Sequence, residues 1–358
     1  MRTLAVLGVV LVTVGAQAFG QQTPVPAKPP YVDNVWLVVS KQQPGVTLYN
    51  ARTDAEICKA RTGVSPHEAA FSADGRLAFI PVYGNSNQGQ PGTNEHAIHI
   101  VNTSDCSEVA IVDTGDHTRP HGIVVGKSGL VYATSENKQS VIVIDPQKRG
   151  VVGTIPTGSQ STHFLALTAD ETKAFTSNVG ARTISVLDIP GRALVKTIDT
   201  SSPNQRVAIS PNQQWFTNQL GQNRSVTFYR VSDTGIDFSV AVEGSPFTGA
   251  FSADNRYYFV MGSVGGGRGA QPPQPPPAGP PGLRVWKIDL KTRAVIATSS
   301  EALGTGAGGL AINPVNGRVY LSSLIANQVS VLDPETLKVV KQIATEPTPD
   351  GIYFGATK

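Results

Sequence analysis

Charged residues, cysteines and long apolar stretches are all scarce in this sequence. Asp, Glu, Lys and Arg make up 15% of the 358 residues, against about 25% in a typical soluble protein. The formal net charge is only +3, and no run of Lys or Arg alternates with aromatic residues, so nucleic-acid binding is not indicated. No helical period of apolar residues recurs, whereas glycine and proline are abundant, which favours an all-β, turn-rich exported domain.

Several signatures of catalysis are also missing. The sequence has no Cys-x-x-Cys-His haem attachment site, no Gly-x-Ser-x-Gly nucleophile elbow and no His-Glu-x-x-His zinc motif. It has no EF-hand loop or Walker sequence either. No standard motif therefore indicates a particular activity.

The first 20 residues have the pattern of a signal peptide. Arg2 precedes an apolar run over residues 4–14, and Ala16-Gln17-Ala18 matches a small-residue cleavage site. The run is about half of the roughly 20 residues that span a bilayer, so we expect cleavage and export to the periplasm or the exterior. An uncleaved anchor is the alternative. Residues 21–30 are Pro-rich and predict an extended linker, and no later segment approaches membrane length.

The rest of the chain is organised by one recurring segment, represented by Pro120-His121-Gly122-Ile123-Val124. Its copies begin at Pro66, Pro120, Thr162, Asn204, Pro246, Ala307 and Pro349. Four of the six spacings between copies are 42 residues. The other two are 54 and 61 residues and contain insertions at residues 84–95 and 263–282. A fixed period in the forties indicates a repeat architecture.

Each repeat contains four short β-rich segments separated by turn residues. Residues 123–125, 130–134, 140–145 and 151–155 form one such set. Four strands per 42 residues predict a β-propeller blade. The chain begins out of phase, at a second strand, and it ends with a first strand, so one blade is assembled from both ends. We therefore predict an all-β, seven-bladed propeller of four-stranded antiparallel blades over residues 31–358.

Two parts of the sequence carry a family resemblance. The Pro-His-Gly-Ile start at Pro120 and residues 319–336 resemble the YVTN-type β-propeller repeat family, and the similarity covers nearly all of residues 31–358. The resemblance implies an exported propeller. Relatives of this kind include binding proteins, and the wider superfamily resembles lactonases and copper- or quinone-linked oxidoreductases. The fold does not choose among these activities.

The only two cysteines, Cys58 and Cys106, fall near the outer edges of neighbouring repeats, at non-equivalent positions. Export permits a disulfide between them. Two separate free thiols are the alternative.

The first strand of a propeller blade lies innermost, so the second residue of each repeat is expected at the mouth of the central channel. These residues are His67, His121, His163, Gln205, Phe247, Gly308 and Asp350. Three consecutive blades therefore place an imidazole there. His96 and His117 lie in links on the same face of the ring, whereas His99 lies inside a strand.

Three interpretations of the channel-mouth histidines remain open. His67, His121 and His163 can bind copper or zinc, or one of them can act as a general base. They can instead contact a small ligand, or they can be repeat-consensus residues that bond the neighbouring backbone. The candidate ligand-binding residues are His67, Glu68, Arg119, His121, His163, Arg206 and Asp350.

Three functional hypotheses follow. The first is an exported, monomeric propeller that binds a small molecule, a metal or a protein partner at the channel mouth. The second is a lactonase-like hydrolase or a metal-dependent oxidoreductase that uses the histidines at the same place. The third is a surface protein that docks through the Gly- and Pro-rich insertion at residues 263–282.

Overall fold

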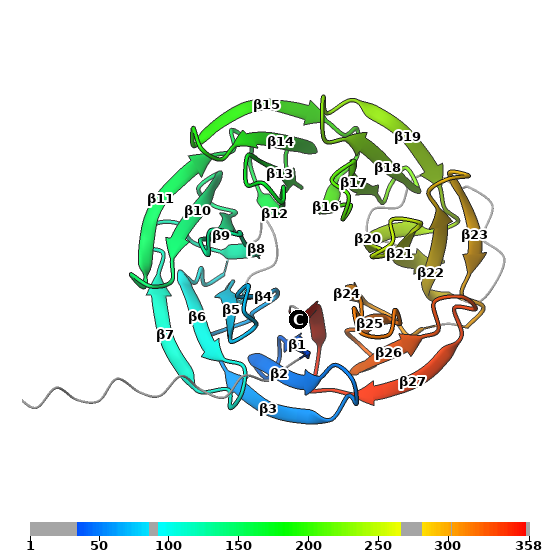
Figure 1. Cartoon of the computed structure of the whole chain (residues 1–358), viewed down its shortest axis with the longest axis horizontal. Helices are drawn as coiled ribbons and strands as arrows, with labels where there is room; N and C mark the ends of the chain where they lie inside the picture. Colours follow the sequence, from blue (N-terminus) through cyan, green and yellow to red (C-terminus); the bar gives the residue numbers. More distant parts are fainter. Residues whose placement is uncertain (1–33, 86–91, 266–280, 302, 356–358) are drawn as a thin grey trace, which may run out of the picture.

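The computed structural model describes residues 34–85, 92–265, 281–301 and 303–355, which form seven four-stranded antiparallel sheets in a ring (Figure 1). This confirms the predicted seven-bladed propeller, including the blade built from both ends. The predicted signal peptide and linker lie outside the described residues, as do residues 86–91 and 266–280 of the two insertions. In the described parts of the chain, no helix has the length and apolar character needed to cross a bilayer.

We number the blades in chain order and give their strands from the channel outward. Blade 1 contains β4 (Ala70–Phe71), β5 (Leu77–Val82), β6 (Ala97–Asn102) and β7 (Glu108–Asp113). Blade 2 contains β8 (Pro120–Val125), β9 (Val131–Ser135), β10 (Ser140–Asp145) and β11 (Gly150–Pro156). Blade 3 contains β12 (Thr162–Leu167), β13 (Lys173–Asn178), β14 (Thr183–Asp188) and β15 (Ala193–Asp199). Blade 4 contains β16 (Asn204–Ile209), β17 (Trp215–Leu220), β18 (Ser225–Arg230) and β19 (Ile236–Ala241).

Blade 5 contains β20 (Ser245–Phe251), β21 (Tyr257–Val264), β22 (Gly282–Asp289) and β23 (Ala294–Thr298). Blade 6 contains β24 (Ala307–Ile312), β25 (Val319–Ser323), β26 (Gln328–Leu332) and β27 (Val339–Ala344). Blade 7 contains β28 (Pro349–Phe354), β1 (Val35–Ser40), β2 (Gly45–Asn50) and β3 (Glu56–Arg61).

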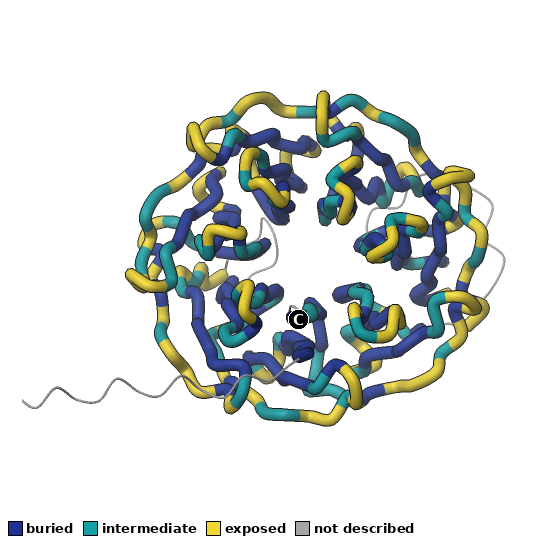
Figure 2. Tube along the Cα trace, in the orientation of Figure 1, coloured by how far each residue is buried: buried dark blue, intermediate teal, exposed yellow. Residues whose placement is uncertain are grey.

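The middle strands of each blade are buried on both faces because every blade stacks between two others. In β10, Ile142 and Ile144 pack toward blade 1, whereas Val141 and Val143 pack toward blade 3. Successive side chains of a strand point to opposite faces, so a strand buried on both faces reads as a continuous apolar run. The outer strands carry many of the exposed residues, on the rim of the ring (Figure 2).

Blade 7 closes the ring because β28 pairs antiparallel with β1. Trp36 lies opposite Phe354 in this pairing and is fully buried. Its ring stacks on Tyr49 of the same blade at 4.3 Å and meets Tyr320 of blade 6 edge-on at 5.3 Å. One aromatic side chain thus fixes the closing blade to the last complete blade.

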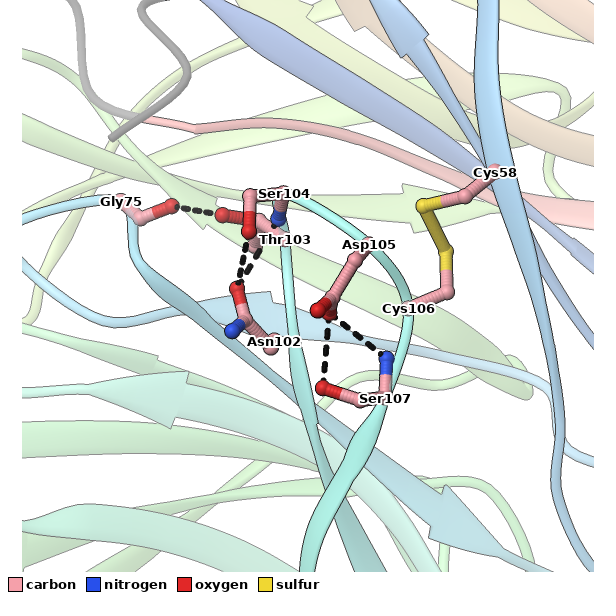
Figure 3. Close-up of a disulfide and its surroundings, with 8 residues drawn as sticks. All are labelled: Cys58, Gly75, Asn102, Thr103, Ser104, Asp105, Cys106 and Ser107. Atoms are coloured by element: carbon pink, nitrogen blue, oxygen red, sulfur yellow. Dashed lines mark hydrogen bonds between the residues drawn. A yellow bond between two sulfur atoms is a disulfide. The ribbon is translucent and has the colours of Figure 1, made fainter. Parts of the chain in front are cut away.

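A disulfide fixes the other side of the closing blade. Cys58 on β3 is bonded to Cys106, which lies in the turn between β6 and β7 of blade 1 (Figure 3). Asn102 and Asp105 hold this turn by accepting hydrogen bonds from the backbone N–H groups of Ser104 and Ser107, respectively. The disulfide alternative of the sequence analysis is therefore confirmed, and it joins blade 7 to blade 1.

We predict that the double substitution Cys58→Ser/Cys106→Ser lowers the free energy of unfolding by about 2–4 kcal/mol, because the unfolded chain regains the freedom that the cross-link removes. Urea unfolding followed by tryptophan fluorescence measures this change. Dithiothreitol should lower the midpoint of the wild-type protein and leave the midpoint of the double variant unaltered. Equal midpoints for the two oxidised proteins would show that the bond does not stabilise the closed ring.

Candidate functional site

The inner strands are irregular where the second residue of each repeat lies. The pairing register shifts between Pro120 and Ile123 in β8 and between Thr162 and Phe164 in β12. The same irregularity occurs in β16, β20 and β24. A bulge re-aims a side chain out of the regular pleat. His121 and His163 therefore leave the packing between blades and meet each other at the channel.

In three of these blades, a hydroxyl group on the second strand fixes the bulge to the next blade. Thr134 Oγ1 accepts a hydrogen bond from the N–H of Gly122 at 2.9 Å and donates one to the carbonyl of His163 at 2.7 Å. Ser177 and Ser322 make equivalent contacts in blades 3 and 6. These buried hydrogen bonds determine the spacing between neighbouring inner strands.

The three predicted histidines lie together. His67 Nδ1 and His121 Nε2 are 3.1 Å apart, and the His121 ring stacks on the His163 ring with centroids at 3.9 Å. His67 Nε2 also lies 3.2 Å from Ser65 Oγ. Because His121 Nδ1 is buried without a hydrogen-bond partner among the described residues, we assign the proton of His121 to Nε2. His121 then donates to His67, and His67 donates to Ser65.

A buried carboxylate completes the histidine group. Glu136 follows β9, is 5% exposed and bonds His163 Nδ1 through one oxygen. Its other oxygen accepts a hydrogen bond from the Tyr83 hydroxyl at 2.6 Å, and the Tyr83 ring stacks on His67 at 4.7 Å. His163 Nε2 has no hydrogen bond to the described residues, and 11% of its side chain remains exposed. His163 therefore has one ring nitrogen, Nδ1, that is held by Glu136 and a second, Nε2, that makes no hydrogen bond to the described residues.

Charged side chains surround these rings. Lys41 Nζ lies 2.6 Å from Asp350 Oδ2, which is 3.8 Å from His67 Nδ1. Burial opposes ionisation of Asp350, but the favourable interactions around it, with Lys41 foremost, together outweigh burial and lower the pKa of Asp350. Arg119 donates from Nε to the side chain of Asn94, and its guanidinium lies 5.5 Å from the centre of the Tyr83 ring. We call the residues of this group the mouth cluster: His67, His121, His163, Tyr83, Glu136, Lys41, Asp350 and Arg119.

Glu68 and Arg206 form a separate bridge. Glu68 precedes β4 in blade 1 and Arg206 lies on β16 in blade 4, so their ion pair at 2.8 Å crosses the channel. Arg206 stacks on Phe164 at 4.1 Å, and Glu68 also accepts a hydrogen bond from the Tyr353 hydroxyl. Burial raises the pKa of Glu68 to about 8, although Arg206 opposes that shift.

The rings of His67 and His121 are neutral at neutral pH. Burial lowers the pKa of both side chains well below 6.5. The Lys41 charge adds to this effect at His67, and the neighbouring imidazoles add to it at His121. A neutral imidazole donates through one nitrogen and accepts through the other, as the chain of hydrogen bonds from His121 through His67 to Ser65 requires.

The predicted copper or zinc site does not fit this arrangement. A metal needs ring nitrogens whose lone pairs converge on one point. His67 and His121 direct a nitrogen at each other, whereas the stacked rings of His121 and His163 lie only 27° from parallel, so their in-plane lone pairs do not converge. Within the described residues, no group of three or more His, Cys, Asp or Glu side chains is placed to hold a metal ion.

The other histidines lie outside the mouth cluster. His96 bonds Asp113, His117 bonds Ser140 and His99 bonds Glu108. The sequence analysis missed Tyr83, Glu136 and Lys41. These three are the first residues after the second strand of their blades, where the chain reaches the same face as the repeat starts. Their common position in the repeat, directly after the second strand, is the sequence feature that identifies them.

Comparison with known proteins identifies the fold. No protein-family model matches the chain, and no curated protein matches its sequence. Among solved structures, the periplasmic gluconolactonase PpgL of Pseudomonas aeruginosa is similar at 15% identity over 91% of this chain and 99% of that one, with a TM-score of 0.69. A putative 6-phosphogluconolactonase of Bacteroides fragilis gives 13% identity, 90% and 98% coverage and a TM-score of 0.69. These likenesses show the fold alone.

A third structural neighbour has a different chemistry. The dihydro-heme d1 dehydrogenase NirN is similar at 15% identity over 92% of this chain and 77% of that one, with a TM-score of 0.66. Propellers with unlike functions therefore share this architecture, and the activity has to be argued from the site.

We predict that acid destabilises the protein through the buried histidines. Their folded-state pKa values lie below the unfolded value of 6.5, so the unfolded chain binds more protons as the pH falls below 6.5, and stability is lost there. Each such histidine contributes a slope of up to about 1.4 kcal/mol per pH unit. Urea unfolding between pH 7 and pH 5 should give a flatter profile for His121→Phe than for the wild-type protein.

The exposed His96 supplies the matched control, because Asp113 raises its pKa. His96→Gln should keep the wild-type loss of stability in acid. If His121→Phe keeps that loss as well, the neutral buried state assigned to His121 is wrong.

Proposed function

We propose that this protein is a β-propeller that binds a small, oxygen-rich molecule, such as a sugar acid, at its mouth cluster. The observation that carries the proposal is the convergence of three imidazoles from consecutive blades beside an ion pair of Lys41 and Asp350. Repeat-consensus residues need only local backbone partners. Here the side chains of His67, His121 and His163 contact one another instead.

The chemistry of the exposed groups favours a polar ligand. Lys41 keeps 22% of its side chain exposed, His67 keeps 17% and His163 keeps 11%. The Lys41 ammonium group can donate to hydroxyl or carboxylate oxygens, and the open Nε2 of His163 can accept a hydrogen bond from a hydroxyl group. In small-molecule sites a few precisely placed polar groups fix the orientation of the ligand.

The pair formed by His163 and Glu136 favours lactone hydrolysis as a second candidate function. A carboxylate that holds one ring nitrogen leaves the other free to accept a proton from water, which is the arrangement of a general base. The hydroxide so formed attacks the lactone carbonyl carbon, and His163 returns the proton to the ring oxygen as the C–O bond breaks. In this proposal the Lys41 ammonium group stabilises the negative oxygen of the intermediate. The gluconolactonase names of two structural neighbours agree with this chemistry.

The proposal also covers the location, the family and the oligomeric state of the protein. Residues 1–20 support export, and the structural likeness to a periplasmic gluconolactonase agrees with it. The repeat segments support a place in the YVTN-type family. We further propose a monomer, with residues 31–358 as one functional unit. The docking role of the Gly/Pro-rich insertion rests on residues 266–280, which lie outside the described residues.

We predict that D-gluconate binds to the wild-type protein and that His163→Gln weakens the binding by about tenfold, because one buried hydrogen bond is lost. Isothermal titration calorimetry measures both affinities. The matched control is His96→Gln, which removes a histidine outside the mouth cluster and should bind as the wild-type protein does. No saturable binding of gluconate by the wild-type protein, or equal affinities in the three proteins, would contradict a sugar-acid site at the mouth cluster.

We predict that Glu136→Gln lowers the rate of glucono-1,5-lactone hydrolysis by about 10²-fold or more if His163 is the base, because the imidazole loses its orienting carboxylate. A pH-stat records the acid released. The His96→Gln variant should retain the wild-type rate. If the protein binds gluconate but does not hydrolyse the lactone faster than the uncatalysed rate, the binding proposal stands and the lactonase proposal is wrong.

A further inference from the structure

Tyr83 is a buried side chain at the centre of the mouth cluster. It directly follows β5 in blade 1, and only 1% of its surface is exposed. Burial of this depth leaves almost no surface for a ligand to contact. The side chains of Lys41 and His163, by contrast, remain partly exposed. A role of Tyr83 in ligand binding therefore has to be exerted through a neighbouring residue.

The ring of Tyr83 is held by its neighbours from several directions. It stacks on the ring of His67 with centroids 4.7 Å apart, and it meets the ring of His121 edge-on at 5.2 Å. The guanidinium group of Arg119 lies 5.5 Å from the ring centre. Stacked and edge-on contacts at these separations are the favourable arrangements of aromatic pairs. They keep the hydroxyl group of Tyr83 pointing in one direction.

This hydroxyl group holds Glu136. It donates a hydrogen bond to Oε2 of Glu136 at 2.6 Å, while Oε1 bonds Nδ1 of His163. The Glu136 side chain is itself only 3% exposed. A buried carboxylate that is bonded through both oxygens is fixed in orientation, and the loss of one donor is costly because water cannot replace it freely. Without the Tyr83 hydroxyl, the carboxylate is free to turn.

The orientation of Glu136 determines how His163 can bind a ligand. An ionised carboxylate only accepts hydrogen bonds, so Nδ1 of His163 carries the proton that Glu136 accepts. In the neutral ring, Nε2 then has a lone pair and accepts a hydrogen bond from a ligand hydroxyl group. If Glu136 turns away, the proton can move to Nε2, which then donates and no longer accepts. The hydrogen bond made by one nitrogen thus sets the role of the other.

We propose that Tyr83 is a positioning residue, which acts through Glu136 to keep Nε2 of His163 as the acceptor for a hydroxyl group of the ligand. The inference rests on the proposed function, because it takes the ligand to bind at His163. It narrows the ligand to hydroxycarboxylates, whose carboxylate pairs with Lys41 and whose hydroxyl group donates to His163. A site that is built to bond a hydroxyl group discriminates strongly against an analogue that lacks it.

The first test needs no ligand. In the full-length protein with ¹⁵N-labelled histidine, the ring ¹⁵N shifts in mildly alkaline buffer report which nitrogen of His163 carries the proton. We expect Nδ1 in the wild-type protein and a mixture of both forms in Tyr83→Phe. The matched control is Tyr320→Phe, which removes a buried hydroxyl group that donates to Asp54 at 2.8 Å, away from the mouth cluster. Unaltered His163 signals in a folded Tyr83→Phe variant would overturn the proposal.

The second test measures the affinity for D-gluconate by calorimetry. Tyr83→Phe should weaken binding by about tenfold, because one oriented hydrogen bond is lost. It should also reduce the preference for gluconate over hexanoate, which has the same chain without hydroxyl groups. Tyr320→Phe should leave both quantities unchanged. The double variant Tyr83→Phe/Glu136→Gln should bind as Glu136→Gln alone does, because Tyr83 then has no carboxylate to hold. Additive losses would show that Tyr83 does not act through Glu136.

The two tests separate this inference from the proposed function. If the wild-type protein does not bind gluconate but Tyr83→Phe alters the His163 signals, the proposed function is wrong and the positioning role stands. If gluconate binds equally well to the wild-type protein and to Tyr83→Phe, the positioning role is wrong. Thermal melts show whether Tyr83→Phe folds. If it does not, wild-type protein made with 3-fluorotyrosine replaces it, since the more acidic phenol bonds Glu136 more strongly and should shift the His163 signals; unaltered signals would overturn the proposal.

Discussion

Pairing of β28 with β1 joins the two ends of the described chain, and the geometry of every other blade depends on it. An open stack of sheets would leave unpaired edges and would not hold blade 7 between its neighbours. The buried ring of Trp36 and the disulfide from Cys58 to Cys106 act on the two sides of this blade. Closure is therefore secured by hydrogen bonds, aromatic packing and a covalent bond together.

Ring closure is also what creates the sites. Glu68 and Arg206 are 138 residues apart in the sequence, yet they meet because blades 1 and 4 face each other across the channel. Asp350 reaches Lys41 and His67 only because the C-terminal strand lies beside the N-terminal ones. A propeller brings one position of each repeat to a common axis, so a small change in one repeat alters the chemistry of a shared site.

The repeat spacing was enough to predict the fold, the number of blades and the composite blade. It also predicted that His67, His121 and His163 would share one end of the channel, because their register in the repeat is the same. Register does not predict side-chain direction. The bulges and the stacking of His121 on His163 decide where the nitrogens point, and these features come from packing between blades.

The same limit explains the other differences between sequence and structure. Glu136 and Tyr83 were missed because their strands end at the mouth only once the blade is assembled. Glu68 and Arg206 belong to a bridge across the channel rather than to the mouth cluster, and one position in the repeat separates them from the clustered histidines. Burial, which is a property of the whole ring, then determines that His121 is neutral.

The central claim is that the terminal strand is a permanent part of the ring. The N–H of Gly355 donates to the carbonyl of Val35 at 2.7 Å, directly after the paired residues of β28. Native-state hydrogen exchange of the β28 amides measures the free energy of opening at this position. The account predicts that these amides exchange as slowly as those of the inner strands of blades 3 and 4. Exchange as fast as that of exposed loops would show that the ring is open and contradict the account.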